Sequence, residues 1–264
     1  MRNFTLLCGF ICLCGAALMG AAQGQENKES EPIITDRPDF TESTETVPDR
    51  MTQVEGGATI TRASSEKSRT LGELLIRKAL GRKLELRIGV PTHLRVVDGN
   101  GSASGFEDGS LGFKVMLSQG SQQSGLKKPR VSLIGATSLP TGSKRFRENT
   151  LQPEVTLALG WDLTERVGLA SNLNYAYLSE EGERFSEFSG SLSLAYSLSE
   201  RVGSYVEFFG FVPSGGRADT RFLNGGFTYL INNDFQLDAR LGFGLGNPGN
   251  GSDYFWGIGA ARRF

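Results

Sequence analysis

The chain has 264 residues, of which 28 are basic and 29 acidic, so its formal net charge is −1. This balance excludes the basic field that a nucleic-acid-binding protein needs, and we expect no nucleic-acid partner. Glycine (35 residues) and phenylalanine (17) are frequent, whereas histidine occurs once. Such a composition suits many strands and turns and offers little for acid–base or metal chemistry. We therefore expect no enzyme, no metal and no cofactor.

Residues 1–24 are expected to be a cleaved signal peptide. Arg2 supplies a positive charge, an apolar run extends from Phe4 to Met19, and small residues follow up to Gly24. The run is short for a helix that must cross roughly 30 Å of hydrocarbon, so an uncleaved anchor is the weaker interpretation. All three cysteines lie in this segment. The processed chain would then hold no disulfide and no thiolate site.

From residue 51 to the end, apolar and polar side chains alternate in short segments. In 83–90, for example, Leu84, Leu86 and Ile88 alternate with Glu85 and Arg87. Because successive side chains of a strand point to opposite faces, this pattern predicts half-apolar β-strands. We predict twelve of them, at 51–62, 70–79, 82–96, 108–118, 129–139, 151–163, 166–178, 186–198, 201–213, 219–231, 234–245 and 253–264.

The connections between these segments are of two kinds that alternate along the chain. Tight turns are expected at residues 80–81, 164–165, 199–200 and 232–233. Longer connections rich in Gly, Ser and charge are expected at 97–107, 140–150, 179–185 and 246–252, and 119–128 is long where a tight turn is expected. Outer-membrane barrels show this asymmetry, with short periplasmic turns and longer outer loops. If both termini are periplasmic, every tight turn falls on the periplasmic side.

The apolar face of each strand is expected to meet lipid, because the opposite face is small and polar. That polar face would line an enclosed lumen, in which every backbone group is paired by closure of the sheet. The predicted lumen-lining residues are Glu85, Arg87, Lys114, Arg130, Glu154, Asn172, Asn174, Glu207, Asp238 and Arg240. Aromatic residues near strand ends, such as Trp161 and Trp256, fit the girdles at the two membrane interfaces.

The last strand alternates apolar residues and ends in Phe264. Such an ending resembles the signal that the outer-membrane barrel assembly machinery reads, so this machinery is an expected partner along with outer-membrane lipid. A soluble β-sandwich or a lipocalin-like barrel would also alternate, but with its apolar face inward. A secreted soluble β-protein therefore stays open as an alternative.

Residues 25–50 form a polar leader punctuated by prolines, typical of an extended segment. Its most distinctive cluster is Asp36, Arg37, Asp39 and Glu42 around Pro38. One interpretation is a solvated periplasmic segment. The other is a plug or gate that folds into the barrel mouth and pairs with lumen charges, for which Arg87, Asp238 and Arg240 are candidates.

The single histidine, His93, is expected to be a strand-end or loop residue. A Ser–His pair is the weaker interpretation, because no pattern places a serine beside it. The basic segment 144–147 is expected to be a solvated outer loop. It is also a weaker candidate for attracting anionic solutes or lipopolysaccharide phosphates.

Several motifs resemble a known family. They are Thr35-Asp-Arg-Pro-Asp-Phe-Thr-Glu-Ser43, Gly105-Phe-Glu-Asp-Gly-Ser-Leu-Gly-Phe-Lys114, Ser138-Leu-Pro-Thr-Gly142 and Asp238-Ala-Arg-Leu-Gly-Phe-Gly244. The sequence resembles the "putative MetA-pathway of phenol degradation" family over most of 33–264. The resemblance implies a Gram-negative outer-membrane β-barrel of transporter type. The phenol link belongs to the family name, and these residues do not indicate an aromatic substrate.

Together these features predict an all-β fold, with one closed antiparallel transmembrane barrel of about twelve strands over 51–264 and a short irregular leader. The expected location is the bacterial outer membrane. The expected function is a channel or transporter that passes small solutes through a narrow polar lumen. The solute itself is not predicted, and a structural or adhesion barrel without a pore is the alternative function.

Overall fold

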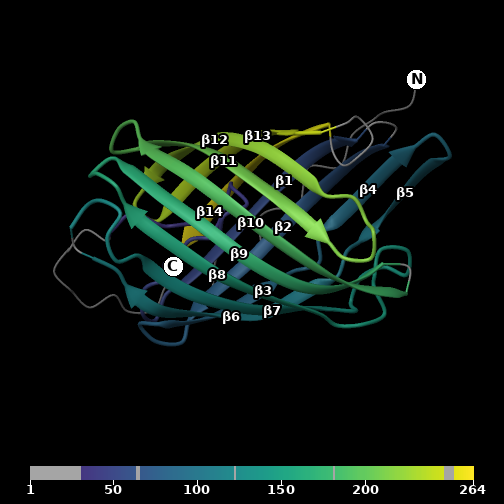
Figure 1. Ribbon diagram of the computed structural model, residues 1–264, viewed down its shortest axis with the longest axis horizontal. Coiled ribbons are helices and arrows are strands. Elements are labelled where there is room, and N and C mark those ends of the chain that lie inside the picture. Colours follow the sequence, from purple (N-terminus) through teal and green to yellow (C-terminus); the bar gives the residue numbers. More distant parts are fainter. Residues whose placement is uncertain (1–30, 64–65, 122, 181, 247–252) are drawn as a thin grey trace, which may run out of the picture. The chain divides into compact units, whose positions relative to one another are not determined.

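A computed structural model describes residues 31–63, 66–121, 123–180, 182–246 and 253–264. It contains fourteen β-strands that form one antiparallel sheet (Figure 1). Their bounds are β1 Thr52–Ala63, β2 Glu66–Ala79, β3 Leu84–Gly89, β4 His93–Asp98, β5 Gly101–Phe106, β6 Gly109–Gln119, β7 Arg130–Leu139, β8 Gln152–Asp162, β9 Val167–Glu180, β10 Glu183–Ser197, β11 Val202–Pro213, β12 Thr220–Asn232, β13 Phe235–Gly244 and β14 Tyr254–Arg263. In the described residues no helix is long and apolar enough to cross a membrane. The expected signal peptide lies outside them.

The sheet closes on itself because its first and last strands pair. β1 is antiparallel to β14 from Gln53↔Arg263 to Arg62↔Tyr254, and β1 also pairs with β2. The strands β6 to β14 pair in chain order around the rest of the ring. The chain passes twelve times across the barrel wall, and two of these passes, here called crossings, each consist of two shorter strands. The predicted closed twelve-stranded barrel is therefore confirmed.

The first interrupted crossing is the predicted strand 82–96, which is broken into β3 and β4 at residues 90–92. Pro91 has no N–H to donate to a neighbouring strand, which explains the break. β3 pairs with the second half of β2 and β4 with its first half. The second interrupted crossing consists of β5 and β6.

Two predicted loops are wrong in extent. Most of the predicted connection 97–107 is strand, because β4 and β5 form a hairpin that pairs from His93↔Phe106 to Asp98↔Gly101. The predicted connection 179–185 is much shorter, since β9 runs to Glu180 and β10 begins at Glu183. Polar side chains at the outer strand ends hide these extensions, because strands that pass beyond the membrane need no apolar face. Most of the predicted loop 246–252 lies outside the described residues.

β2 begins at Glu66, earlier than predicted, and contains a bulge. Its register with β1 shifts at Glu55 and Gly57, opposite Gly72 and Glu73, whose φ angles are 107° and 41°. The extra residue puts both Thr70 and Glu73 on the inner face. A bulge interrupts the two-residue period, which explains why β2 alternates poorly in the sequence.

The two faces of the barrel are inverted relative to a soluble protein. Large apolar side chains are exposed on the outside, for example Leu71 (63% exposed), Phe227 (60%) and Ile258 (58%). Charged side chains are buried inside, and Arg77, Glu85 and Lys114 are each 0% exposed. Water would be a poor solvent for such an exterior, whereas lipid chains match it. The secreted soluble alternative is therefore excluded.

The tight turns and both ends of the described barrel share one rim. Leu80, Leu163 and Leu198 donate backbone hydrogen bonds across their turns at 2.8–2.9 Å. At the same rim the Thr52 N–H donates to the carbonyl oxygen of Phe264 at 3.1 Å. By the usual asymmetry of outer-membrane barrels, this is the periplasmic rim.

Candidate functional site

All ten predicted lumen residues have side chains on the inner face of the barrel. Cross-strand pairs join several of them or their neighbours on that face, such as Glu85↔Lys114 and Ala158↔Asn172. Six of the ten are buried: Glu85, Arg87, Lys114, Asn172, Glu207 and Asp238. What buries them is residues 31–50, here called the inner segment, which runs through the barrel interior.

The inner segment is anchored at Asp36 by three cations from the wall. The Asp36 carboxylate accepts hydrogen bonds from Arg87 Nη1 at 2.5 Å and Lys114 Nζ at 2.9 Å, and Arg77 Nη1 lies 3.4 Å away. Burial alone would raise the pKa of Asp36, but these cations outweigh it and hold that pKa well below its usual range. Asp36 is thus a buried carboxylate that stays charged. Arg87 was one of the lumen charges predicted to pair with the cluster of Asp36, Arg37, Asp39 and Glu42, and it does pair with Asp36.

Three wall residues that were not predicted complete this anchor: Gln53, Glu55 and Arg77. Glu73 was not predicted either, and it contacts Arg37 instead. Arg77 Nη1 donates to Glu55 and its Nε donates to Glu85, both at 2.8 Å. The Asp36 N–H donates to the Glu55 carboxylate at 3.0 Å. Gln53 and Glu55 alternate with apolar residues, so the two-residue period could have found them. Arg77 is preceded by Ile76 and followed by Lys78, which conceals its inward direction.

A second anchor is the Glu207 carboxylate on β11. It accepts hydrogen bonds from the backbone N–H of Phe40 at 2.9 Å and of Thr41 at 2.7 Å. The Thr41 hydroxyl donates to it at 2.5 Å and Asn224 Nδ2 at 3.0 Å. The Phe40 ring stacks on Phe209 with 4.7 Å between centroids. A buried carboxylate with four donors fixes the backbone path of the segment here.

Arg37 forms a third anchor on the β2 and β13 side. Its guanidinium lies 2.7 Å from Glu73 and 3.4 Å from Asp238. A Cβ at Gly259 would lie 2.5 Å from Arg37 Nε, so only glycine leaves room for the guanidinium there. Nearby, Arg240 Nη1 donates to the carbonyl oxygen of Pro38 at 3.0 Å. Both Asp238 and Arg240 therefore meet the inner segment.

The remaining cluster residues also contact the wall. Glu42 forms an ion pair with Arg87, and Ser193 Oγ donates to Asp39 at 3.1 Å. Burial, with the Glu207 carboxylate nearby, raises the pKa of Asp39 well above its usual range. Asp36 and Asp39 are therefore shifted in opposite directions within one segment.

Other predicted lumen residues lie apart from these anchors. Arg130 reaches Glu45 of the inner segment at 3.2 Å and also pairs with Asp162 on β8. Asn174 donates to Ser189 on the wall at 2.9 Å, and Glu154 borders a cavity on the outer side. Arg130 and Glu154 therefore border open space, whereas Asn174 bonds to the wall.

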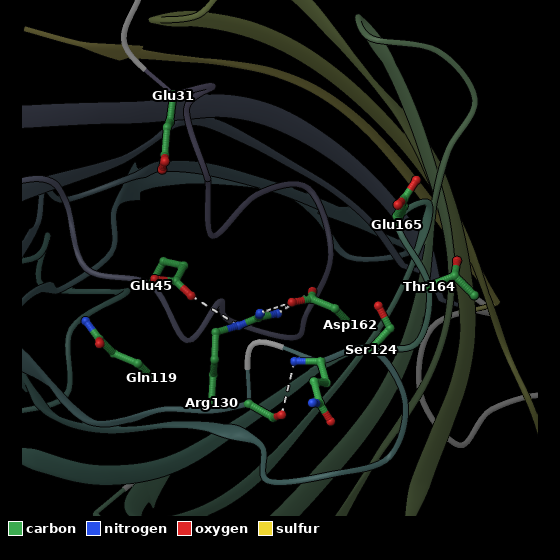
Figure 2. A pocket seen from close by; sticks show the side chains of 10 residues that line it. Glu31, Glu45, Gln119, Ser124, Arg130, Asp162, Thr164 and Glu165 are labelled. Carbon is green, nitrogen blue, oxygen red and sulfur yellow. Dashed lines mark hydrogen bonds and ion pairs between the residues drawn. The ribbon is translucent and has the colours of Figure 1, made fainter. Parts of the chain in front are cut away.

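Two cavities flank the inner segment. The periplasmic cavity, about 590 Å³, is lined by Glu31, Glu45, Gln119, Arg130 and Asp162 among others, and Figure 2 shows Glu45, Arg130 and Asp162 pointing toward one another there. The outer cavity, about 400 Å³, is lined by residues that include Glu42, Arg87, Gln152 and Glu154. None of the described residues lines both cavities.

The layer that separates the cavities contains the middle of the inner segment. Ser132 on β7 donates to the carbonyl oxygen of Thr44 at 2.5 Å, and Lys114 donates to that of Ser43 at 2.9 Å. Ser132, Thr156 and Ala158 of the wall are at most 2% exposed at this level. The inner segment is therefore packed against β7 and β8 at this level, between a periplasmic and an outer vestibule.

Two further expectations from the sequence concern His93 and metal binding. His93 begins β4, as expected for a strand end, and its ring meets Phe106 with 5.4 Å between centroids. No group of three or more His, Cys, Asp or Glu residues could hold a metal ion within the described ranges. The chemistry of this interior is that of ion pairs and hydrogen bonds.

The closed twelve-stranded ring, the apolar exterior and the charged interior define a porin-like outer-membrane β-barrel. Residues 35–264 match the family described as "Putative MetA-pathway of phenol degradation", and the chain belongs to this family. The resemblance seen in the sequence motifs is thus confirmed. The chain is a bacterial outer-membrane protein whose exterior contacts lipid.

Solved structures show the same fold. An outer membrane channel from Pseudomonas putida F1 is similar with a TM-score of 0.66 and 16% identity, over 84% of this chain and 98% of that one. The NanC porin is similar with a TM-score of 0.54 and 12% identity, over 80% and 98% of the two chains. A search of the curated proteins finds none whose sequence matches.

Proposed function

We propose that this barrel is an outer-membrane channel that the inner segment closes, and that solutes pass when the segment is displaced. The observation that carries the proposal is the layer at Thr44 and Ser132, where the segment packs against the wall between two vestibules. A barrel with a purely structural role would not need a cavity on each side of the inner segment, whereas a channel closed by that segment would. The similar fold of a channel and a porin also supports this proposal.

Small hydrophilic solutes are the proposed cargo. The wall that displacement would uncover carries carboxylates, guanidinium groups and amides, which suit solutes that can hydrogen-bond. Cations and anions alternate along it, as at Arg87, Glu85 and Lys114, so the wall favours no single sign of charge. The phenol in the family description is a property of the name and is not part of this proposal.

Assembly and export are part of the same proposal. Phe264 is 66% exposed at the end of the chain, on the rim where β14 meets β1. We propose that this exposed terminal strand is what the barrel assembly machinery reads, and that residues 1–24 direct export before cleavage. Residues 25–50 then act as the plug or gate, with Asp36, Arg37, Asp39 and Glu42 as its contacts.

Deleting residues 25–48 tests the channel function. In planar bilayers we expect the deletion variant to conduct steadily and the full chain to open rarely. Unchanged conductance would argue against a plug. Liposome swelling with small sugars separates the remaining alternative, because a structural or adhesion barrel would leave both forms impermeable.

A further inference from the structure

Four cations form a patch on the outer face of the barrel, away from the periplasmic rim. They lie on three neighbouring strands, β1, β2 and β4, near the hairpin that Figure 1 shows as β4 and β5. Arg62 on β1 is directly opposite Lys67 on β2, and Arg69 on β2 is directly opposite Arg95 on β4. These four exposed residues, Arg62, Lys67, Arg69 and Arg95, are called the basic patch.

The strand registers put all four side chains on one face. Lys67, Arg69 and Leu71 follow one another at intervals of two residues on β2, so their side chains share one face. Leu71 is 63% exposed and points toward lipid. The bulge at Gly72 and Glu73 lies beyond them, so it does not disturb this alternation. Directly opposite side chains of an antiparallel pair have Cβ atoms about 5 Å apart. The patch is therefore a compact group of four positive charges.

Such a group is unfavourable when left alone. Like charges directly opposite each other destabilise a sheet. Yet none of the described residues forms an ion pair with Arg62, Lys67, Arg69 or Arg95. Glu66 directly precedes Lys67 on β2, and Asp98 directly follows Val97 on β4. The side chains of these two acidic residues therefore point to the opposite face of the sheet. An anion held between the two pairs would remove this repulsion.

The surroundings of the patch indicate what carries that anion. On the same outer face lie the exposed apolar side chains of Leu71, Phe106 and Trp256, which are 63%, 51% and 43% exposed. Ser104, directly opposite Arg95 on β5, adds a hydroxyl to the same row. A ligand that fits both features has acyl chains for the apolar surface and phosphate for the cations.

We propose that the basic patch binds the phosphate groups of phosphorylated lipids in the outer leaflet. Guanidinium groups match phosphate oxygens through paired, charge-assisted hydrogen bonds, and three of the four cations are arginines. The acyl chains of the same lipid lie along Leu71, Phe106 and Trp256. The patch thus holds a lipid beside the crossing that contains the break between β3 and β4.

Native mass spectrometry of the full chain in detergent tests the assignment. The probes are lipid A with both phosphates, dephosphorylated lipid A, and inorganic phosphate. A cation near an anionic membrane surface contributes roughly fivefold to binding, so removing four is expected to weaken lipid A binding at least about tenfold. The patch variant carries Arg62→Gln, Lys67→Gln, Arg69→Gln and Arg95→Gln.

The matched control removes four exposed cations at the periplasmic rim. It carries Arg82→Gln, Lys83→Gln, Arg166→Gln and Arg201→Gln, and so changes the net charge equally. We expect the control to bind lipid A like the wild type, and heat-modifiable migration to show that both variants are folded. Equal binding by the patch variant and wild type would overturn the proposal. The proposal would also be overturned if the control variant lost lipid A binding to the same extent as the patch variant, or if inorganic phosphate displaced lipid A.

Discussion

The substitution Asp36→Asn removes one charge from the centre of the inner segment and leaves its shape. The amide oxygen of the substituted side chain can still accept the hydrogen bonds that Ser43 donates at 2.7 and 2.8 Å. The contacts with Arg87 at 2.5 Å and Lys114 at 2.9 Å lose their charge, and so does the 3.4 Å approach of Arg77. Removing one partner from a buried ion pair costs about 3–5 kcal/mol.

The remaining carboxylates set where in this range the effect falls. Arg77 keeps Glu55 and Glu85, both at 2.8 Å, and Arg87 keeps Glu42. We therefore expect the lower end, about 3 kcal/mol. Because about 1.4 kcal/mol is a factor of ten, the displaced state gains roughly a hundredfold.

Single-channel recording in planar bilayers measures this shift as open probability. Asp49→Asn is the control, because Asp49 is an exposed residue at the end of the same segment and pairs only with Arg50 among the described contacts. Heat-modifiable migration checks that each variant is folded. If folded Asp36→Asn channels open no more often than the wild type, the ion pairs at Asp36 do not hold the segment.

Three further results are expected. The raised pKa of Asp39 means that the closed state is fully favoured below the ordinary value of 3.8 and weakens as the pH rises toward and through the raised value; open probability should therefore increase with pH in this window, and Asp39→Asn should flatten the profile. Gly259→Ala should displace the Arg37 guanidinium and raise open probability about tenfold, whereas Gly135→Ala, with open space around its Cβ position, should change nothing. Phe264→Ala should alter the unfolding temperature of the purified barrel by only a few degrees, because the ring is 66% exposed, while the amount assembled in cells falls several-fold.

The barrel itself could be predicted because its physical cause is local. In each strand, residues that face lipid alternate with residues that face the interior, as in Leu84, Glu85, Leu86 and Arg87. This alternation can be recognised in a single sequence. The alternation fails where a second effect intervenes. Pro91 breaks one crossing, and the bulge at Gly72 shifts the period of β2.

The site was less predictable because its contacts are long-range. Asp36 and Lys114 are 78 residues apart, and Thr41 and Glu207 are 166 apart. Composition marked residues 36–42 as unusual, but it could not choose between a solvated leader and a segment in the lumen. Arg77 was missed because Lys78 beside it obscures which of the two cations points inward.

A reversible crosslink between the inner segment and the wall tests the proposed gate most directly. A Cβ at residue 160 would lie 3.2 Å from Thr44 Oγ1 and 3.4 Å from Thr44 Cγ2, close to what a disulfide needs. Thr44→Cys and Gly160→Cys would be combined with Asp36→Asn, so that opening is frequent enough to measure, with each single cysteine as a control. We predict that the oxidised double-cysteine channel stays closed, and that reducing agent restores the open probability of the Asp36→Asn parent. An oxidised channel, with the crosslink verified by mass spectrometry, that conducts as well as the reduced one would contradict a gate formed by residues 31–50.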